Sequence, residues 1–189
     1  MPEKVTRCWK TDTPLHVKYH DEEWGVQLHD DNMFFEFLVL GGFQAGLTWW
    51  LILQRREVFR KAFDNFDPQK VALYTSKDIE RLMQTSKIIH NKQKISAAIN
   101  NASCFLEAQK EFGSFDVFIW KFVNWQTIKN SYIDLSALPA ETEESKAMSH
   151  ELRKRGFKFV GPTICYAFMQ ATGLVNDHII GCFRHNQIQ

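Results

Sequence analysis

Hydrophobic residues recur with helical spacing along most of the chain. Polar capping residues at 30–32 precede an apolar run over Met33–Leu40, which we expect to end at Gly41–Gly42. A second helix is predicted from Thr48 to Phe63, because its apolar residues fall on one face. The same argument predicts a long helix from Asn91 to Gly113. Helical periodicity therefore dominates the chain from about Asp30 onward.

Shorter helices are predicted from capping residues and prolines. They cover Gln69–Tyr74 after an Asp-Pro start, a segment capped by Ser76, Phe115–Val123, a segment from Thr142 to Gly156 and one from Pro162 to Gly173. Residues 130–140 lack periodicity and are predicted to form a loop. No alternating run is long enough to predict a strand, and there is neither an internal repeat nor a flexible linker. The pattern predicts an all-α fold over residues 1–189, as one domain or as two lobes that share their termini.

The composition excludes several classes of protein. The chain has 189 residues, of which 44% are hydrophobic and 24% charged, so disorder and collagen-like repeats are not expected. No apolar stretch approaches 18 residues, so we expect neither a transmembrane helix nor a membrane partner. The segment Met1–Cys8 has no apolar run of the secretory type. A cytoplasmic protein is therefore the expectation.

A balanced net charge of +1 means that any binding of nucleic acid would need locally clustered charge. Such a cluster occurs in Lys154–Thr163, where a glycine-bounded turn lies between two predicted helices. Its positive charge is expected from Lys154, Arg155 and Lys158. The turn would bring Lys158, Gly161 and Thr163 to the N-terminus of a helix, where backbone amides bind anions. A helix-hairpin-helix grips a DNA phosphate in this way without reading sequence. An ordinary corner between two helices, with a solvated basic face, explains the pattern equally well.

Four cysteines are too few for a disulfide framework at this length, so they are interpreted as buried thiols or metal ligands. His178 and Cys182 are four positions apart and would face the same way on a helical turn. Cys8 and His20 supply two more ligands, and a Cys2His2 set suits a structural zinc ion with no open position. The spacing between Cys8 and His20 is not that of a zinc finger, so spacing alone leaves the metal open.

Aromatic residues are frequent, and several lie among polar residues near the N-terminus. The set comprises Trp9, His16, Tyr19, Trp24, Phe43, Gln44, Trp49 and Trp50. Residues 41–49 are predicted to form a glycine-punctuated loop that presents Leu47 as an apolar wedge. Flat side chains on two sides of a cavity could hold an extruded base. A tryptophan-rich core is the alternative interpretation.

Four motifs stand out along the chain: Tyr19-His20-Asp21-Glu22-Glu23-Trp24-Gly25-Val26, Gln44-Ala45-Gly46-Leu47-Thr48-Trp49, Arg155-Gly156-Phe157-Lys158-Phe159-Val160-Gly161 and Gly173-Leu174-Val175-Asn176-Asp177-His178. Together they resemble one enzyme family, the helix-hairpin-helix glycosylases of the DNA-3-methyladenine glycosylase I type. The resemblance runs in order from Cys8 to Cys182. It implies an all-α helix-hairpin-helix fold, and one structural zinc ion on Cys8, His20, His178 and Cys182 that joins the N- and C-terminal segments.

The resemblance also implies roles for particular residues. Tyr19, Trp49 and Trp9 match base-pocket aromatics, and Leu47, next to Gly46, matches the residue that fills the gap left in the duplex. Gly161 falls in the hairpin that holds the phosphate backbone. The implied partner is double-stranded DNA that contains alkylated bases, and the expected enzyme is a monomer of the bacterial cytoplasmic type.

Two positions depart from the family pattern. The glutamate with which the family hydrogen-bonds the flipped adenine falls at Gly41, and a pocket tyrosine falls at His16. Glu36, His16 or Asp177 could substitute for the missing carboxylate. The implied activity is monofunctional hydrolysis of the N-glycosidic bond of alkylated bases, chiefly 3-methyladenine, by base flipping. A weakened damage-binding protein, or a glycosylase for another lesion, remains an alternative.

Overall fold

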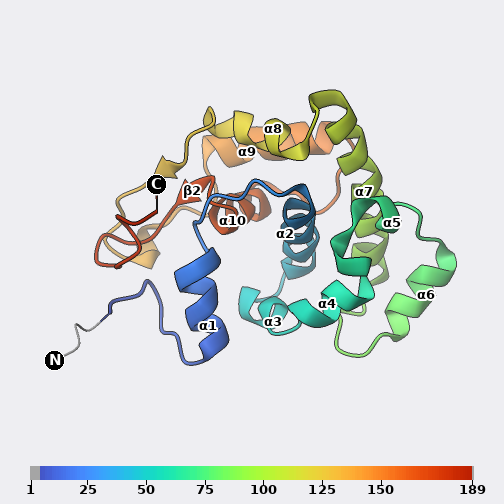
Figure 1. The fold of residues 1–189 in the computed structure, drawn as a ribbon, viewed down its shortest axis with the longest axis horizontal. Coiled ribbons are helices and arrows are strands. Elements are labelled where there is room, and N and C mark those ends of the chain that lie inside the picture. The colour runs from blue at the N-terminus through green and yellow to red at the C-terminus, as the bar shows by residue number, and fades with distance from the viewer. Residues whose placement is uncertain (1–4, 189) are drawn as a thin grey trace.

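The computed structural model describes residues 5–188, so four residues of the segment considered as a possible signal, Met1–Lys4, lie outside the described part. The fold is predominantly helical, as predicted. Its α-helices are α1 (Pro14–Lys18), α2 (Asp31–Gln44), α3 (Trp49–Leu53), α4 (Arg56–Ala62), α5 (Pro68–Val71), α6 (Ser76–Gln84), α7 (Lys92–Phe112), α8 (Phe115–Trp120), α9 (Glu143–Lys154) and α10 (Pro162–Ala171). Figure 1 shows α2 in the middle of the molecule, and α2 contacts both α7 and α10.

Helix α2 is the core element, and it is longer than the sequence pattern predicts. Every residue from Phe34 to Phe43 is buried, so the helix is covered on all sides. The helix was expected to end at Gly41–Gly42, but it continues to Gln44. A Cβ atom at Gly42 would lie 3.5 Å from the Cβ atom of Phe159. The glycine therefore serves close packing against the turn before α10, and tertiary burial overrides its poor helix propensity.

One further helix prediction is corrected, and one helical region was not predicted. The segment predicted as one helix from Thr48 to Phe63 is broken at Gln54–Arg55 into α3 and α4, although Thr48 does cap α3 as predicted. The N-terminal region, which lacks a long apolar pattern, forms α1 and a π-helical turn over Tyr19–Glu23. These elements are too short for periodicity to reveal them.

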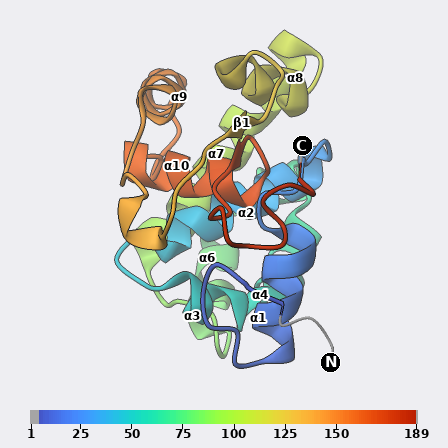
Figure 2. The same cartoon turned by 90° about the vertical axis from the view of Figure 1, so that its left-hand side faces the viewer.

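The N- and C-terminal segments lie side by side, as Figure 2 shows. The Phe183 amide donates to the Thr6 carbonyl at 3.1 Å, which joins the two segments directly. A small parallel sheet of β1 (Ile128–Lys129) and β2 (Val175–Asn176) lies close by. Gly173, with a φ of +74°, allows the backbone of Val26 to approach so closely that any Cβ atom would meet it at 2.3 Å. The N-terminal segment thus packs directly on the end of α10.

Helix α7 holds two loops through buried polar side chains. The Lys94 ammonium donates to the carbonyls of Phe43 and Ala45, at 2.8 and 2.5 Å, and so caps the C-terminus of α2 with positive charge. Two turns further along the same helix, Asn101 accepts from the Lys158 amide and donates to the Lys158 carbonyl. One helix therefore sets the positions of the loop after α2 and of the turn between α9 and α10.

Candidate base pocket, phosphate turn and metal cluster

A cavity of about 280 Å³ opens between the N-terminal segment, α2, α3 and α10. Phe37, Gly41 and Gln44 lie on one face of α2 with the spacing i, i+4, i+7, so a single helix supplies one wall. The complete lining is Trp9, His16, Tyr19, Trp24, Phe37, Gly41, Gln44, Trp49, Trp50, Ala167, Phe168, Gln170 and Ala171. The cavity gathers the three aromatic residues predicted for it, Trp9, Tyr19 and Trp49, together with Gly41.

The aromatic rings of the pocket contact one another. The ring centroids of Tyr19 and Trp49 are 5.4 Å apart, and Trp49 stacks on Phe37 at 6.2 Å. Trp9 meets Trp24 edge-on at 4.7 Å. Burial raises the pKa of the Tyr19 hydroxyl well above its usual value, so Tyr19 is a neutral phenol. The pocket is therefore a flat-walled, largely apolar space.

Of the three residues considered as substitutes for a pocket carboxylate, His16 alone lines the cavity. Its ring lies 3.7 Å from that of Trp50, centroid to centroid. Glu36 is buried on the other side of α2, where it accepts hydrogen bonds from Arg56 and Arg60. Asp177 is also buried and lies outside the lining. Glu36 is therefore committed to holding α4 against α2.

The loop from Ala45 to Thr48 connects α2 to α3 at the rim of the cavity. It is shorter than predicted, because α2 takes up its first four residues. Gly46 has a φ of +77°, and the Leu47 amide donates back to the Gln44 carbonyl at 2.6 Å, which closes a tight turn. Leu47 projects from this turn with 38% of its surface exposed. The geometry presents a large apolar side chain to solvent beside the pocket.

The segment between α9 and α10 is a compact turn. Phe157 and Val160 are buried, whereas Lys158 and Thr163 are exposed. Gly161 is the N-cap of α10, and Pro162 occupies its first turn. A Cβ atom at Gly161 would lie 3.4 Å from an Arg153 guanidinium nitrogen, so Arg153 also lies at this turn.

The positive charge of the turn differs from the charge that the sequence suggests. Arg155 is engaged by Glu111 and Glu151, with nitrogen–oxygen distances of 2.6 and 2.8 Å. Its charge is therefore neutralised within the protein. Arg153, Lys154 and Lys158 are exposed, and Arg153 takes the place expected for Arg155. Arg153 was not predicted from the sequence, because it was not foreseen that Arg155 pairs with Glu151 one helical turn earlier while Arg153 stays in solvent.

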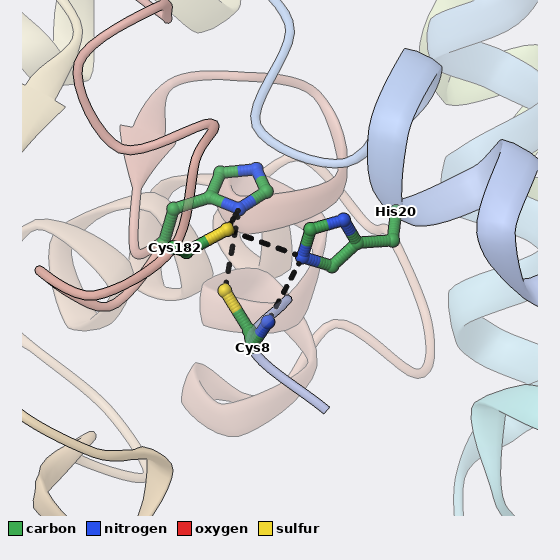
Figure 3. A group of neighbouring side chains, drawn as sticks. Cys8, His20 and Cys182 are labelled. Carbon is green, nitrogen blue, oxygen red and sulfur yellow. Dashed lines mark hydrogen bonds between the residues drawn. The ribbon is translucent and has the colours of Figure 1, made fainter. Parts of the chain in front are cut away.

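The four candidate metal ligands form one buried cluster, in which all ligand atoms lie within 4.8 Å of one another. Cys8 Sγ is 3.3 Å from His178 Nδ1, and Cys182 Sγ is 3.4 Å from the same atom and 3.5 Å from His20 Nε2. Figure 3 shows Cys8, His20 and Cys182 pointing toward a common centre. His178 and Cys182 were expected on a helical turn. In the structure they lie in the loop and turn that follow β2. The turn nevertheless brings both side chains to the cluster.

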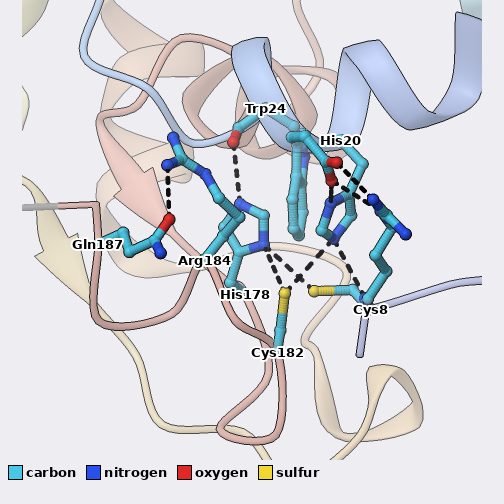
Figure 4. A network of polar contacts seen from close by, with 9 residues as sticks. Cys8, His20, Trp24, His178, Cys182, Arg184 and Gln187 are labelled. Atoms are coloured by element: carbon cyan, nitrogen blue, oxygen red, sulfur yellow. Dashed lines mark hydrogen bonds and ion pairs between the residues drawn. The ribbon is translucent and has the colours of Figure 1, made fainter. Parts of the chain in front are cut away.

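Surrounding groups orient both imidazoles of the cluster (Figure 4). His20 Nδ1 contacts the Asp21 carboxylate at 2.7 Å, and His178 Nε2 contacts the Trp24 carbonyl at 3.0 Å. Each histidine thus has its other ring nitrogen directed at the cluster, the arrangement usual for metal-ligating histidines. Burial lowers the pKa of His178 to about 4 and raises the pKa of Cys8 to about 12. Burial also lowers the pKa of His20, so both imidazoles are neutral.

The cluster lies directly behind the pocket. Cys8 precedes Trp9, and His20 follows Tyr19, so two of the ligands are chain neighbours of pocket rings. The Trp9 ring also meets the His20 ring edge-on at 4.7 Å. A group that holds this cluster together would hold one wall of the pocket as well.

Several pocket residues were not predicted from the sequence. Phe37 belongs to a helix with apolar residues on every side, so its pattern does not indicate which face meets the cavity. Gln170 and its neighbours come from α10, more than a hundred residues away in the chain. The i, i+4, i+7 spacing from Phe37 to Gln44 could have indicated Phe37, whereas no local spacing indicates the residues of α10.

A base-sized aromatic pocket with an exposed apolar side chain at its rim is typical of proteins that bind an extruded base. A sequence profile described as methyladenine glycosylase matches residues 9–185. The chain is 49% identical over 179 residues to DNA-3-methyladenine glycosylase 1 of Escherichia coli (strain K12), covering 94% of this chain and 96% of the relative. The chain therefore belongs to the methyladenine glycosylase family.

Solved structures agree with this assignment. A crystal structure of 3-methyladenine DNA glycosylase I superposes with a TM-score of 0.90 at 47% identity, covering 94% of this chain and 98% of the other. A variant of such an enzyme, solved in complex with 3-methyladenine, superposes with a TM-score of 0.89 at 35% identity, covering 92% of this chain and 93% of the other. Within residues 5–188, no helix is both long enough and apolar enough to cross a membrane.

Proposed function

We propose that this protein is a base-excision repair glycosylase that flips alkylated bases, chiefly 3-methyladenine, out of double-stranded DNA and hydrolyses their N-glycosidic bond. The observation that carries the proposal is the aromatic cavity of about 280 Å³ with Leu47 exposed at its rim. The relatives described above are named as enzymes of this activity. We propose that the enzyme acts on DNA in the cytoplasm of a bacterial cell. We also propose that it acts as a monomer.

The chemistry requires little acid catalysis. In the nucleotide, 3-methyladenine carries a positive charge, which the electrons of the breaking C1′–N9 bond neutralise as the base leaves. Water then adds to C1′ and loses one proton. Tyr19 and Trp49 would favour the cationic base by about 0.5 to 2 kcal/mol for each well-placed ring. Extrusion, orientation and exclusion of water are therefore the main tasks of the pocket.

We propose that the turn between α9 and α10 is the hairpin of a helix-hairpin-helix motif that binds a DNA phosphate. Gly161 and Thr163 lie at the N-terminus of α10, and Lys158 and Arg153 add positive charge beside them. Leu47 on the Gly46 turn would occupy the space that the flipped base leaves in the duplex. Contacts of this kind bind the backbone without reading sequence.

We propose one structural zinc ion held by Cys8, His20, His178 and Cys182. The donor set is that of a closed tetrahedral site, and zinc bonds of about 2.0 to 2.3 Å place ligand atoms roughly 3.5 Å apart, which matches the 3.3 to 3.5 Å contacts of the cluster. The Cys8 amide donates to His20 Nε2, the ring nitrogen with which His20 would bind the metal. When bound, zinc supplies a cross-link between the two terminal segments.

Metal analysis tests the zinc site. Protein purified without added zinc should contain about one equivalent, and Cys182→Ala should lose it and melt several degrees lower. Cys165→Ala is the matched control, because Cys165 is also buried but lies outside the cluster. Absence of zinc in the wild type, or equal melting of Cys182→Ala and the wild type, would contradict the proposal.

A release assay tests the activity. DNA treated with a methylating agent should yield free 3-methyladenine when incubated with the protein, at a rate well above that of the untreated reaction. Release of a different methylated base instead would indicate another lesion as substrate. Tight binding of damaged duplex without release of any base would indicate a damage-binding protein.

A further inference from the structure

Among residues 5–188, those that line the pocket include no carboxylate, because Gly41 offers no side chain and Glu36 points away from the cavity. Its polar groups are the Tyr19 hydroxyl, the indole N–H groups of four tryptophans, and the side chains of His16, Gln44 and Gln170. A base held only by aromatic faces would not be distinguished by its exocyclic groups, since stacking is tolerant of base identity. Discrimination therefore requires a polar group whose donor and acceptor atoms have set positions.

Gln170 meets this requirement, because a buried carboxylate orients its amide. Gln170 Nε2 donates to Asp177 Oδ2 at 2.7 Å. Asp177 is 1% exposed, and it also accepts from the Tyr166 hydroxyl at 2.6 Å and from Asn130 Nδ2 at 2.7 Å. Three donors thus surround one carboxylate, as burial of such a group requires.

The carboxylate determines which way the amide points. Both carboxylate oxygens of Asp177 accept hydrogen bonds from their neighbours, so the NH2 group of Gln170 must face Asp177. Turning the amide over would set two oxygen atoms against each other. The amide oxygen therefore points away from Asp177, and the half-buried Gln170 side chain lines the cavity. The network thus leaves the amide oxygen turned away from Asp177, on an uncharged residue that lines the cavity.

We propose that Gln170 is a specificity-determining residue, whose Oε1 accepts a hydrogen bond from the 6-amino group of flipped 3-methyladenine, and that Asp177 is a positioning residue that holds this orientation. The proposal rests on the proposed glycosylase function. 3-Methylguanine carries a carbonyl oxygen in place of that amino group, and it would be repelled by Oε1. Sites built to hydrogen-bond one exocyclic group reject the analogue that lacks it.

The experiment measures kcat/KM for release of 3-methyladenine and of 3-methylguanine from methylated duplex DNA. Gln170→Leu replaces the amide by an apolar side chain that is one atom shorter, and so removes both the acceptor and the donor to Asp177. Its ratio of 3-methyladenine to 3-methylguanine release should fall about tenfold or more. Asp177→Asn keeps the shape of the carboxylate but lets the Gln170 amide turn over, so its ratio should fall although Gln170 is intact.

Tyr166→Phe is the matched control. It removes one hydrogen bond from Asp177 but leaves the contact with Gln170, so its ratio should stay within about twofold of the wild type. Melting temperature is measured for all variants. Zinc content is measured for Asp177→Asn, because His178 is the next residue. The proposal would be overturned if the ratio of 3-methyladenine to 3-methylguanine release fell in proportion to melting temperature across the three variants. It would also be overturned if the ratio were unchanged in Gln170→Leu.

Binding of the free bases separates this proposal from the proposed function. Quenching of tryptophan fluorescence reports the affinity of wild type and Gln170→Leu for free 3-methyladenine. If the wild type releases no base but binds free 3-methyladenine at least tenfold more tightly than Gln170→Leu does, glycosylase activity is refuted and the role of Gln170 stands. Equal binding by both proteins overturns the role of Gln170, whatever the release assay shows.

Discussion

The base pocket and the turn between α9 and α10 are assembled in different ways. The turn is one contiguous segment, and its buried Phe157 and Val160 anchor it between two successive helices. The pocket takes its walls from the N-terminal segment, α2, α3 and α10, which are distant in sequence. Under the proposed function, general affinity for DNA therefore resides in a local motif, whereas recognition of a base depends on the whole fold. Substitutions in the two regions should therefore have separable effects.

Trp49→Ala should have the largest effect on activity. Loss of stacking and of cation–π attraction should reduce release of 3-methyladenine by on the order of a hundredfold or more. Affinity for undamaged duplex should change by less than about twofold, because the substitution leaves the turn between α9 and α10 intact. Trp125→Ala is the control, since Trp125 is 62% exposed and lies outside the pocket. An equal loss of duplex binding and of base release in Trp49→Ala would show that the two regions do not act separately.

Gly41→Glu should raise release of 3-methyladenine by about tenfold, because a carboxylate adds a charge-assisted hydrogen bond in the pocket. The site has room, since the nearest contact of a new Cβ atom would be Ile164 Cγ2 at 3.5 Å. The gain should be smaller for 7-methylguanine, whose exocyclic oxygen would face the carboxylate. Melting is measured beside activity, because glycine is a poor helix former. An unchanged or lower rate at equal folded fraction would mean that the pocket is built around the glycine.

Lys158→Ala should weaken binding to damaged and undamaged duplex alike, by about fivefold. The logarithmic dependence of affinity on salt should become shallower by about one unit, as expected for the loss of one phosphate contact. Titrations at several salt concentrations on two unrelated base sequences measure both effects. A loss confined to one sequence would show that the turn reads bases.

Arg155→Ala should have the smallest effect on DNA, less than about twofold at any salt concentration. Glu111 and Glu151 already neutralise Arg155, so it has little charge to offer a phosphate. Comparison with Lys158→Ala, three residues away, isolates the role of exposed charge at the turn. A shallower salt dependence in Arg155→Ala would show that the ion pairs open when DNA binds.

The sequence by itself determined the helical class and most helix starts, because capping and helical periodicity are local properties. The cap at Asn91 and the proline at the start of α10 were confirmed in this way. The resemblance to the family also indicated the four candidate zinc ligands, which the structure brings together. Only the tertiary structure decided that α2 continues through Gly41–Gly42, since packing against a distant segment outweighs helix propensity.

The tertiary structure also decided the polar chemistry of the pocket. No pattern in the sequence indicates that Glu36 pairs with two arginines or that Gln170 is oriented by Asp177. Hydrogen bonds between distant segments depend on which side chains are buried together, and burial is a property of the packed molecule rather than of local sequence. The motifs in the sequence therefore indicate the family and the scaffold, whereas the groups that face the base follow from how the helices pack.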